Sequence, residues 1–388
     1  MRGECLPGRG KRCVNPAGGF GMDELKACLA LRHTKGLGAR TWKRLLVEWG
    51  SAAEAVLHCR TWNTRGLAPA RVQAEFQSGT WRTRAESEER AVRATGCKIV
   101  FWEDYPECLR QISDPPLCLY CLGDVSLLAR PCVAVVGSRQ ASNYGLGMAG
   151  TIARDLGRAG ICVVSGMAQG IDAAAHAGAL EGPGSTIAVL GTGIDLVYPA
   201  SNVRLREAIA ERGLLVSEFS PGTRPEGPNF PHRNRIVSGL SLGVLVVEGA
   251  LGSGSLVTAG LALRQNREVF ALPGPANLKT YQGCHRLIRE GACLVQSAED
   301  ILYELGPRLA AEAFVPAKLP APPEAAPCTP GDPEHAELHG HLSAGPLHID
   351  ELVRLSGWSA EKVSAALLFM ELQGLVKQLP GMYYSVCG

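Results

Sequence analysis

Short apolar runs that end in glycine, serine or threonine recur through the middle of this chain of 388 residues. They are VAVVGSR at 133–139, VVSGMAQGID at 163–172, IAVLGTGIDLVYP at 187–199, VLVVEGALGSGS at 244–255 and EVFALPG at 268–274. Most of them lead into a helical pattern. Repeated units of strand, tight turn and helix build a parallel sheet whose loops gather at one edge. We therefore predict an α/β fold with an extended Rossmann-like domain at 80–305, its core spanning about residues 98–304.

Helical patterns precede this domain. Over 23–58 the apolar residues Leu25, Leu29, Leu45, Leu46 and Val56 fit helical faces, and Gly36 and Gly38 mark a turn between helices. The pattern predicts a small module of the helix-hairpin-helix (SAM-like) type at 23–79, and the polar segment 80–96 is helical in character. Two hypotheses stay open. Either the turn amides with Arg40, Lys43 and Arg44 bind a DNA phosphate, or these charges only solvate the module.

The end of the chain is predicted to form a linker and a further domain. Proline and alanine dominate 306–340, and such a composition cannot bury enough apolar surface to fold. Residues 341–388 contain two helical patterns joined at Gly357, followed by two strand-like runs, which is the outline of a winged helix. Residues 301–388 hold 5 Lys and Arg against 10 Asp and Glu. This acidic balance favours protein contact or regulation over DNA binding. It also argues against the hypothesis that the winged helix controls transcription.

Composition bounds the class of protein. Hydrophobic residues make up 46% and charged residues 20% of the chain, and no apolar stretch reaches the roughly 20 residues of a membrane span. Residues 1–22 lack the apolar core of a secretory signal, and we expect them to be disordered or to precede a true start at Met22. Residues 1–100 carry 18 Lys and Arg against 9 Asp and Glu, which is compatible with nucleic acid.

The 14 cysteines are spread over a long chain, which favours reduced thiols of a cytoplasmic protein. Cys118 and Cys121 form one C-x-x-C pair without a second pair at suitable spacing, so two packed thiols are favoured over a zinc site. The histidines His335, His339 and His341 lie near the Pro/Ala-rich stretch and are expected in a solvated linker. We therefore predict neither a metal nor a cofactor.

The first glycine turn has the chemistry of an anion site. Gly137 lets the backbone come close to a ligand, amides at the start of a helix near Tyr144 attract an anion, and Arg139 adds a fork of donors. Ser138 lies between them in the same turn. From these residues alone, a mononucleotide and a DNA phosphate fit equally well.

The second turn repeats the design with Ser165, Gly166 and Gly170. Asp172 falls in the first helical turn, where a carboxylate stabilises the amides and repels phosphate, so a structural role is favoured over ligand binding. Asp195 carries the same ambiguity, and a catalytic pair of the two stays an open alternative, although no nucleophile, lysine or histidine recurs beside them.

The segment FPHRNR at 230–235 supplies two arginines whose spacing points them to different sides. One of Arg233 and Arg235 can face a phosphate while the other anchors the loop, with Asn234 between them. Phe230 either stacks an unpaired base or packs under the start of a helix. A further amide-rich turn comprises Gly252, Ser253, Gly254 and Ser255, and no lysine follows it in the Walker pattern, so ATP binding of that kind is not expected.

Together, these segments resemble, in their order and wording, the DNA-processing protein A family (DprA, also called Smf) over about residues 110–302. The resemblance implies sequence-independent binding of single-stranded DNA, delivery of that DNA to RecA recombinase in natural transformation, a homodimer, and no catalytic activity. With the family, Phe230, Arg233 and Arg235 become expected DNA contacts or supports of the pocket. The nucleic-acid-binding residues that we predict are Gly137, Ser138, Arg139, Ser165, Gly166, Gly170, Phe230, Arg233, Asn234, Arg235, Gly252, Ser253, Gly254 and Ser255.

The chain departs from the family pattern at two places. Only Arg224 stands where many members carry a basic residue before FPxRNR, and Tyr281-Gln282-Gly283-Cys284-His285 replaces S-x-G-x-N. The first departure puts in doubt the DNA affinity of the turn before FPxRNR, which forms one wall of the expected DNA pocket. At the second departure, Gly283 and the following LIREGA are retained, which predicts that the fold is kept. The alternative function is a nucleotide-binding hydrolase or sensor. Related Rossmann-like phosphoribohydrolases carry P-G-G-x-G-T-x-x-E, and the corresponding ALGSGSLVTA here lacks the glutamate.

Overall fold

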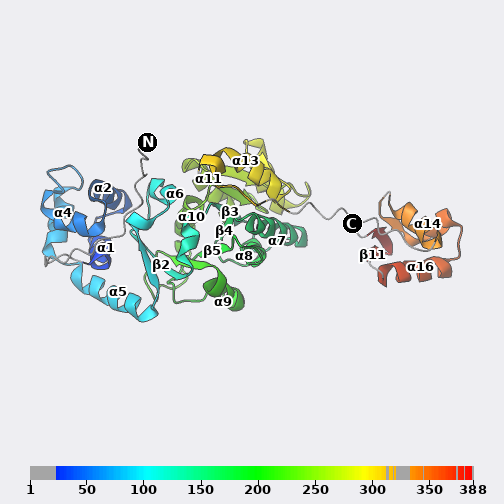
Figure 1. The fold of residues 1–388 in the computed structure, drawn as a ribbon, viewed down its shortest axis with the longest axis horizontal. Helices are drawn as coiled ribbons and strands as arrows, with labels where there is room; N and C mark the ends of the chain where they lie inside the picture. Colours follow the sequence, from blue (N-terminus) through cyan, green and yellow to red (C-terminus); the bar gives the residue numbers. More distant parts are fainter. Residues whose placement is uncertain are drawn as a thin grey trace, which may run out of the picture. The chain divides into compact units, whose positions relative to one another are not determined.

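The computed structural model describes residues 23–311, 314–317, 319, 333–343, 345–372, 375–379 and 381–386 (Figure 1). The chain divides into two compact units, residues 1–319 and residues 320–388. The predictions for residues 1–22 and for the centre of the linker fall outside the described residues.

Within the described residues, a sheet of nine strands forms the centre of the first unit, in the order β1-β2-β6-β5-β4-β3-β7-β8-β9. All neighbouring strands from β6 to β9 are parallel, whereas β2 runs antiparallel to both β1 and β6. The strands are β1 (Lys98–Phe101), β2 (Cys118–Gly123), β3 (Cys132–Val136), β4 (Cys162–Ser165), β5 (Thr186–Val189), β6 (Leu214–Ser217), β7 (Gly243–Val246), β8 (Glu268–Ala271) and β9 (Cys293–Leu294). The predicted mostly parallel α/β core is thereby confirmed.

Helices cover both faces of this sheet. They are α6 (Glu107–Gln111), α7 (Asn143–Arg158), α8 (Ile171–Ala179), α9 (Val203–Arg212), α10 (Asn229–Gly239), α11 (Gly254–Arg264), α12 (Gln282–Arg289) and α13 (Ala298–Ala311), with the short helices η2 (Trp102–Asp104), η3 (Val125–Ala129), η4 (Ala200–Asn202) and η5 (Lys279–Tyr281). Val133 and Val135 of β3 pack into one core with α7, α8 and α13, whereas Ala134 and Val136 pack into the other. Both faces are buried, which explains why the parallel strands read as continuous apolar runs.

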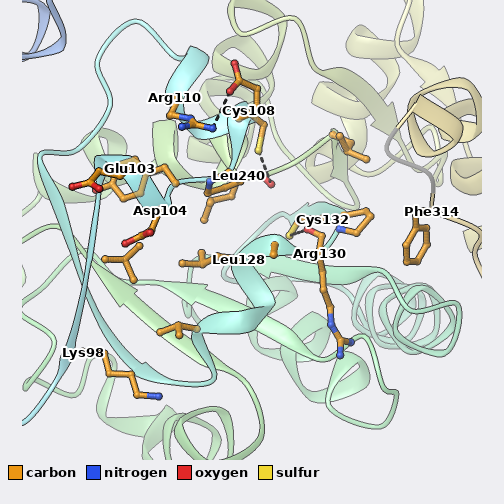
Figure 2. Close-up of a pocket in the computed structure, with 18 of the residues that line it drawn as sticks. Lys98, Glu103, Asp104, Cys108, Arg110, Leu128, Arg130, Cys132, Leu240 and Phe314 are labelled. Atoms are coloured by element: carbon orange, nitrogen blue, oxygen red, sulfur yellow. Dashed lines mark hydrogen bonds and ion pairs between the residues drawn. The ribbon is translucent and has the colours of Figure 1, made fainter. Parts of the chain in front are cut away.

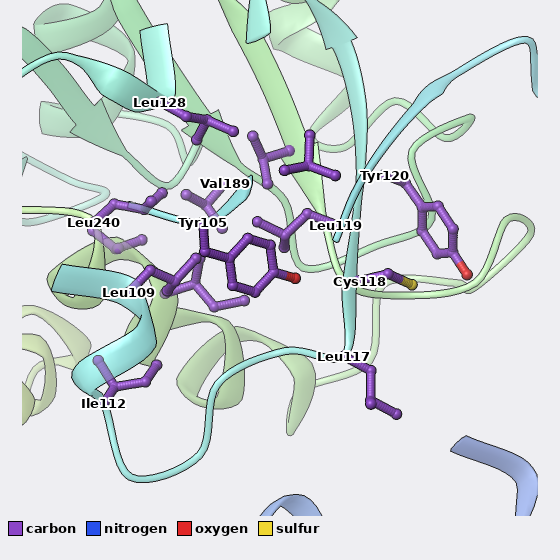
Figure 3. Close-up of a cluster of buried hydrophobic side chains, with 14 of the residues drawn as sticks. Tyr105, Leu109, Ile112, Leu117, Cys118, Leu119, Tyr120, Leu128, Val189 and Leu240 are labelled. Carbon is purple, nitrogen blue, oxygen red and sulfur yellow. The ribbon is translucent and has the colours of Figure 1, made fainter. Parts of the chain in front are cut away.

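The core that contains Ala134 and Val136 continues under α6. Tyr105, Leu109 and Ile112 enter it from that side and meet Leu119 of β2 and Leu240 after α10 (Figure 3). A proline precedes α6, so the helix starts at a residue with preset backbone geometry. This cluster joins the antiparallel edge strands to the parallel part of the sheet.

The N-terminal helices are α1 (Glu24–His33), α2 (Ala39–Trp49), α3 (Ala52–Leu57), η1 (Cys59–Thr61), α4 (Ala70–Ser78) and α5 (Arg82–Thr95). The turn predicted at Gly36 and Gly38 does separate α1 from α2, and Gly36 has a φ of +84°, which favours glycine. Leu29, Leu45 and Leu46 are fully buried and belong to the same core as the sheet. The helical N-terminal region therefore packs as part of the first unit.

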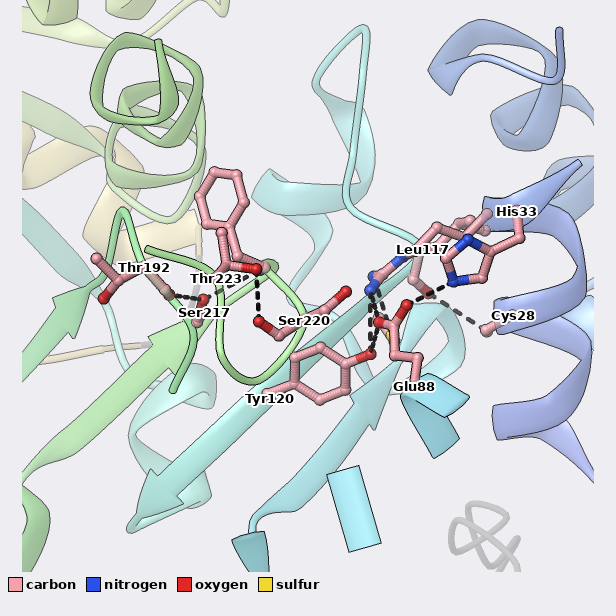
Figure 4. Close-up of polar contacts among 12 residues, drawn as sticks. Cys28, His33, Glu88, Leu117, Tyr120, Thr192, Ser217, Ser220 and Thr223 are labelled. Atoms are coloured by element: carbon pink, nitrogen blue, oxygen red, sulfur yellow. Dashed lines mark hydrogen bonds and ion pairs between the residues drawn. The ribbon is translucent and has the colours of Figure 1, made fainter. Parts of the chain in front are cut away.

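A polar network centred on Glu88 of α5 fastens these helices to strand β2 (Figure 4). Arg32 Nη1 donates to Glu88 Oε1 at 2.5 Å, Tyr120 Oη donates to the same oxygen at 2.7 Å, and His33 Nε2 lies 2.7 Å from Oε2. Burial alone would raise the pKa of Glu88, but the hydrogen bond to His33 and the charge of Arg32 outweigh it and lower the pKa to about 2. Arg32 also reaches the buried thiol of Cys118, at 3.4 Å.

The second unit comprises α14 (Pro333–Leu342), β10 (Leu347–His348), α15 (Ile349–Ser356), α16 (Ala360–Leu372), β11 (Val376–Leu379) and β12 (Tyr383–Val386). Its three described strands pair in the order β10-β12-β11. The predicted pair of helices joined at Gly357 and the predicted strand pair are both present, and Gly357 takes a φ of +69° at the end of α15. These elements form a winged helix, as the sequence predicted.

The ends predicted for the linker were wrong. Helix α13 continues through Pro307 to Ala311, because Leu305 and Leu309 lie one turn apart and bury in the sheet core. Helix α14 begins at Pro333, inside the predicted linker, because Leu338 and Leu342 bury in the core of the winged helix. Apolar residues spaced four apart outweigh the local proline and alanine content at both ends.

Candidate nucleic-acid interface

The order of the strands identifies the edge at which a ligand is expected. The chain runs outward from β3 through β4 and β5 to β6, and then returns to place β7 on the other side of β3. In open parallel sheets, ligands bind beyond the carboxyl ends of the strands near such a switch point. The glycine turns after β3, β4, β5 and β7 all lie at this edge, together with the start of α10.

A small pocket of about 50 Å³ opens between the turns after β3, β4 and β5. We call it the Arg139 pocket. Its lining residues are Arg139, Gly166, Met167, Ala168, Gln169, Leu190, Gly191, Thr192, Tyr198, Pro199, Phe230 and Arg233. Of the predicted site residues, the structure thus brings Arg139, Gly166, Phe230 and Arg233 together.

Two aromatic rings and an exposed guanidinium form the mouth of this pocket. Arg139 is exposed, and its Cζ lies 5.5 Å from the centre of the Phe230 ring. The Tyr198 ring lies 5.5 Å from that of Phe230 at an interplanar angle of 36°, and Tyr198 is 41% exposed. Phe230 packs over Gly191, where a Cβ would approach its ring to 2.7 Å. The ring therefore packs on one side, as one of the two interpretations expected, and lines the pocket on the other, where base stacking stays a prediction.

Arg233 forms the floor of the pocket and is 4% exposed. Its Nη1 donates to the carbonyl of Val189, and its Nε has no hydrogen-bond partner among the described residues. Burial, with the nearby charge of Arg139, lowers the pKa of Arg233 to about 10, against the opposing effect of Asp172. Its guanidinium thus places a buried positive charge at the bottom of the pocket.

Arg235 lies outside the pocket and is 3% exposed. Its Nη1 and Nη2 donate to the two oxygens of Glu218 at 3.0 and 2.6 Å, and its Nε lies 3.2 Å from Asp114 Oδ2. The hydrogen bonds to His232 and Arg235 hold the pKa of Glu218 below its ordinary value despite burial. Of the two roles expected for the arginine pair, this geometry supports anchoring for Arg235. Asn234, between the two arginines, is half-buried.

The turn after β4 is held by its own carboxylate. Asp172 Oδ2 accepts from the amides of Gly166 at 3.1 Å and Ala168 at 3.3 Å, and the side chain is buried. This is the structural role that the sequence favoured. Two predicted site residues are affected, because the Gly166 amide already has a partner and Ser165 donates its hydroxyl to Val135 O inside the sheet. Gly170 has a φ of +78°, and a Cβ there would collide with Ser138 O.

The remaining predicted turns lie beside the pocket. The Ser138 amide donates to Glu248 O at 2.7 Å, and a Cβ on Gly137 would come within 2.6 Å of Ile171. After β7, Gly252 and Gly254 are exposed, whereas Ser255 is buried with its hydroxyl 2.8 Å from that of Ser253. The 252–255 turn does not line the Arg139 pocket.

The second carboxylate of the proposed catalytic pair is also bound to backbone. Asp195 accepts from the Gly222 amide at 2.9 and 3.0 Å. His176, near Asp172, accepts from the Met167 amide, and burial lowers its pKa to about 3, so the ring stays neutral. Among the described residues, no three His, Cys, Asp or Glu side chains group as metal ligands, and Cys118 and Cys121 are buried thiols on β2.

Of the basic residues in the N-terminal helices, Arg40 and Arg44 are exposed, whereas Lys43 donates to the carbonyls of Gln111 and Ile112. Lys43 therefore helps fasten α2 to the carboxyl end of α6. Arg224 is exposed in the loop before α10, and its carbonyl accepts from Asn229. Gly283, in the first turn of α12, packs so closely on Gly249 that a Cβ would collide with its carbonyl.

A larger pocket of about 1170 Å³ lies at the amino ends of the strands (Figure 2). Lys98, Arg110 and Arg130 line it together with Glu103 and Asp104. Charges of both signs give this pocket no preference for a polyanion. Among the described residues, no helix combines the length and the apolar character that crossing a bilayer requires.

Two residues of this edge were missed by the sequence analysis. Tyr198 precedes a proline in the exposed loop after β5, and an aromatic residue in such a loop was a usable signal for base stacking. Glu248 lies two residues after the end of β7 and is 1% exposed. A carboxylate at the end of a buried strand, next to glycine turns, also marks a site-shaping residue.

Comparison with known protein families gives two matches. Residues 98–306 match the family model described as DNA recombination-mediator protein A, and residues 320–382 match the DprA winged helix domain. Protein Smf of Escherichia coli is 41% identical over 286 residues, covering 72% of this chain and 75% of that protein. DNA processing protein DprA of Streptococcus pneumoniae is 46% identical over 200 residues, covering 52% of this chain and 71% of that protein.

Solved structures of DNA processing protein A also resemble this chain. The X-ray structure of DNA processing protein A from Streptococcus pneumoniae aligns with a TM-score of 0.65 at 36% identity, covering 74% of this chain and 99% of that one. A structure of DNA processing protein A from Helicobacter pylori, titled for its single-stranded DNA binding mode, aligns with a TM-score of 0.50 at 32% identity, covering 54% of this chain and 97% of that one.

Proposed function

The chain belongs to the DNA recombination-mediator protein A (DprA/Smf) family, and on this basis we propose that it binds single-stranded DNA, whatever its sequence, at the Arg139 pocket. The observation that carries the proposal is the grouping of one exposed and one buried guanidinium with two aromatic rings at the switch-point edge. Phosphates and unpaired bases are the two chemical features that every single strand offers.

Each group in the pocket has a distinct task. Arg139 is exposed and presents a planar fork of donors to a backbone phosphate. Phe230 and Tyr198 offer ring faces to a base, and such stacking contributes roughly 1–3 kcal/mol per base for any base. Arg233 supplies positive charge from below, and Arg235 holds helix α10 so that Phe230 and Arg233 keep their positions.

The residues of the predicted amide turns have different roles in the proposal, because several of their amides already have a partner within the protein. The exposed turn at Gly252 and Gly254 lies at the start of α11, where amides attract phosphate. Gly137, Ser138 and Gly170 shape the turns so that Arg139 reaches the pocket. Gly166 and Ser165 act as supports, because their donors are committed to Asp172 and Val135.

Delivery of the bound strand to RecA, and self-association as a homodimer, are part of the proposal on grounds of family membership alone. Binding without cleavage is favoured by the carboxylates of Asp172 and Asp195, which both accept hydrogen bonds from backbone amides. A carboxylate used in this way fixes a loop and is poorly placed to act as a general base.

Titration of fluorescent oligothymidine, a duplex of equal length and a mononucleotide, each at several salt concentrations, tests the proposal. We expect the single strand to bind more tightly than the duplex, with an affinity that falls steeply with salt, because phosphate contacts release counterions. Equal affinity for both DNA forms would remove the preference for single strands. Tight binding and turnover of the mononucleotide would favour the hydrolase alternative.

A further inference from the structure

Two helices begin beside the switch point, α7 after β3 and α11 after β7. In Rossmann-like folds, the start of the helix after the first strand commonly binds a nucleotide phosphate, because its amides have no partner within the helix. The glycine turn at Gly137 gives α7 the same approach. This chain therefore contains a phosphate site of the usual type, unless something else occupies it.

The carboxylate of Glu248 lies at the start of α7. Its Oε2 accepts from the Ser142 amide at 2.9 Å and from the Ser142 hydroxyl at 2.7 Å. Ser142 is the N-cap of α7, and its hydroxyl in turn accepts from the Gly145 amide at 3.1 Å. A Cβ on Gly145 would collide with Glu248 Oε2, so the carboxylate lies directly against the first turn.

The surroundings enclose this carboxylate. Glu248 is 1% exposed, and the fully buried Tyr281 places its hydroxyl 3.3 Å from Ser142 Oγ. Tyr281 occupies the position at which the family pattern differs in this chain. Burial, together with the Glu248 carboxylate, raises the pKa of Tyr281 to about 12, so its hydroxyl keeps the proton at neutral pH.

We propose that Glu248 is a built-in anion that occupies the phosphate position at the start of α7 and thereby excludes mononucleotides from the switch point. Its Oε2 takes the role that a phosphate oxygen takes elsewhere, as the acceptor for the amide and the hydroxyl of Ser142, the N-cap of α7. A second anion could not enter without facing this buried negative charge at close range. Glu248 is thus a specificity-determining residue.

This assignment also bears on where a DNA strand lies. The start of α7 is closed, so phosphates are directed to Arg139 on one side of β3 and to the exposed turn at Gly252 and Gly254 on the other. The inference stands on the hydrogen bonds of Glu248 and does not require that the chain bind DNA. It explains how a fold that often binds nucleotides can reject them.

The test uses the full chain with Glu248→Ala and, as a second variant that also leaves room, Glu248→Ser. Glu299→Ala is the matched control, because Glu299 is an exposed glutamate in the first turn of α13. Inorganic phosphate and adenosine monophosphate are titrated by calorimetry, and the melting temperature is followed against phosphate with sodium chloride at equal ionic strength. A ligand that binds only the folded state raises the melting temperature.

We expect the Glu248 variants to bind phosphate at least tenfold more tightly than the native chain and Glu299→Ala, and to gain stability from phosphate but not from chloride. If a variant is too unstable to purify folded, phosphate should restore its circular dichroism. The proposal is overturned if folded variants respond to phosphate like the native chain, or if their lost stability is not restored by phosphate. Oligothymidine binding by the native chain, measured in parallel, tests the DNA proposal separately.

Discussion

Replacement of Arg139 by alanine tests the DNA site most directly, because Arg139 is the exposed cation of the pocket and its neighbours do not depend on it for folding. Its guanidinium stacks on Phe230 at 5.5 Å, and no shift of the backbone is needed to remove it. A hydrogen bond between a charged donor and a phosphate contributes about 1.5–3 kcal/mol, and exposure places Arg139 at the lower end. We therefore expect a loss of roughly tenfold in affinity for oligothymidine.

The salt dependence gives an independent measure of the same contact. Each phosphate contact contributes about 0.7 to the slope of log affinity against log salt for single strands, so Arg139→Ala should reduce the slope by about that amount. Because phosphates carry no sequence information, oligothymidine, oligocytidine and mixed sequences should lose affinity equally. Arg139→Lys keeps the charge and loses the fork, and should retain the slope with an intermediate affinity.

The matched control is Arg158→Ala. Arg158 is exposed at the opposite end of α7, so the variant removes the same charge far from the pocket. Fluorescence anisotropy of one labelled oligonucleotide, at four or so salt concentrations, suffices for all three variants. If Arg139→Ala retained the native slope, or lost no more affinity than Arg158→Ala, the phosphate contact would be refuted and the strand would have to bind elsewhere.

Three further predictions concern Phe230, Arg235 and Glu88. Phe230→Ala should weaken binding of oligothymidine by about 1–3 kcal/mol but leave binding of an abasic strand unchanged, since only the base is lost; equal losses for both strands would contradict stacking. Arg235→Ala should lower the free energy of unfolding by about 3–5 kcal/mol in a denaturant titration, because the buried Glu218 loses both guanidinium hydrogen bonds and is left with the contact to His232; a loss below about 1 kcal/mol would contradict the anchoring role. The Glu88 pKa of about 2 lies below its ordinary value of 4.5, so its stabilisation is present above pH 4.5 and is lost as the pH falls toward 2; Glu88→Gln should reduce that pH dependence in thermal melts, and an identical profile would refute the assignment.

Strands β3, β4, β5, β7 and β8 were predicted because each is a short apolar run followed by a glycine turn. Strand β6 at Leu214–Ser217 lacks such a turn and was not predicted, although it lies between β2 and β5. Its identity depends on pairing with strands that are distant in the chain. Strand β9 has two residues and is defined only by its ladder to β8, so no local pattern could reveal it.

The site was predicted in part for the same reason. The sequence indicated that two arginines spaced two apart have different roles, but not which partner each has. Arg235 meets Glu218 and Asp114, which lie 17 and 121 positions earlier in the chain, and Arg233 meets the carbonyl of Val189. Pairings across such separations follow from the sheet order rather than from local spacing. Tyr198 and Glu248 were not predicted because their roles depend on contacts with Phe230 and Ser142, which are distant from them in the chain.

The charges around the pocket bear on how tightly the proposed site would hold a polyanion. Arg139 and Arg233 contribute two positive charges, and Asp172, whose carboxylate influences Arg233, contributes one negative charge. The pocket thus has one excess positive charge, enough to neutralise a single phosphate. Arg233 contributes its charge from a buried position, and burial lowers its pKa to about 10. Under the proposed function, affinity built from one phosphate and one or two stacked bases at the pocket is modest, and a long strand would be held by several contacts rather than by a single tight one.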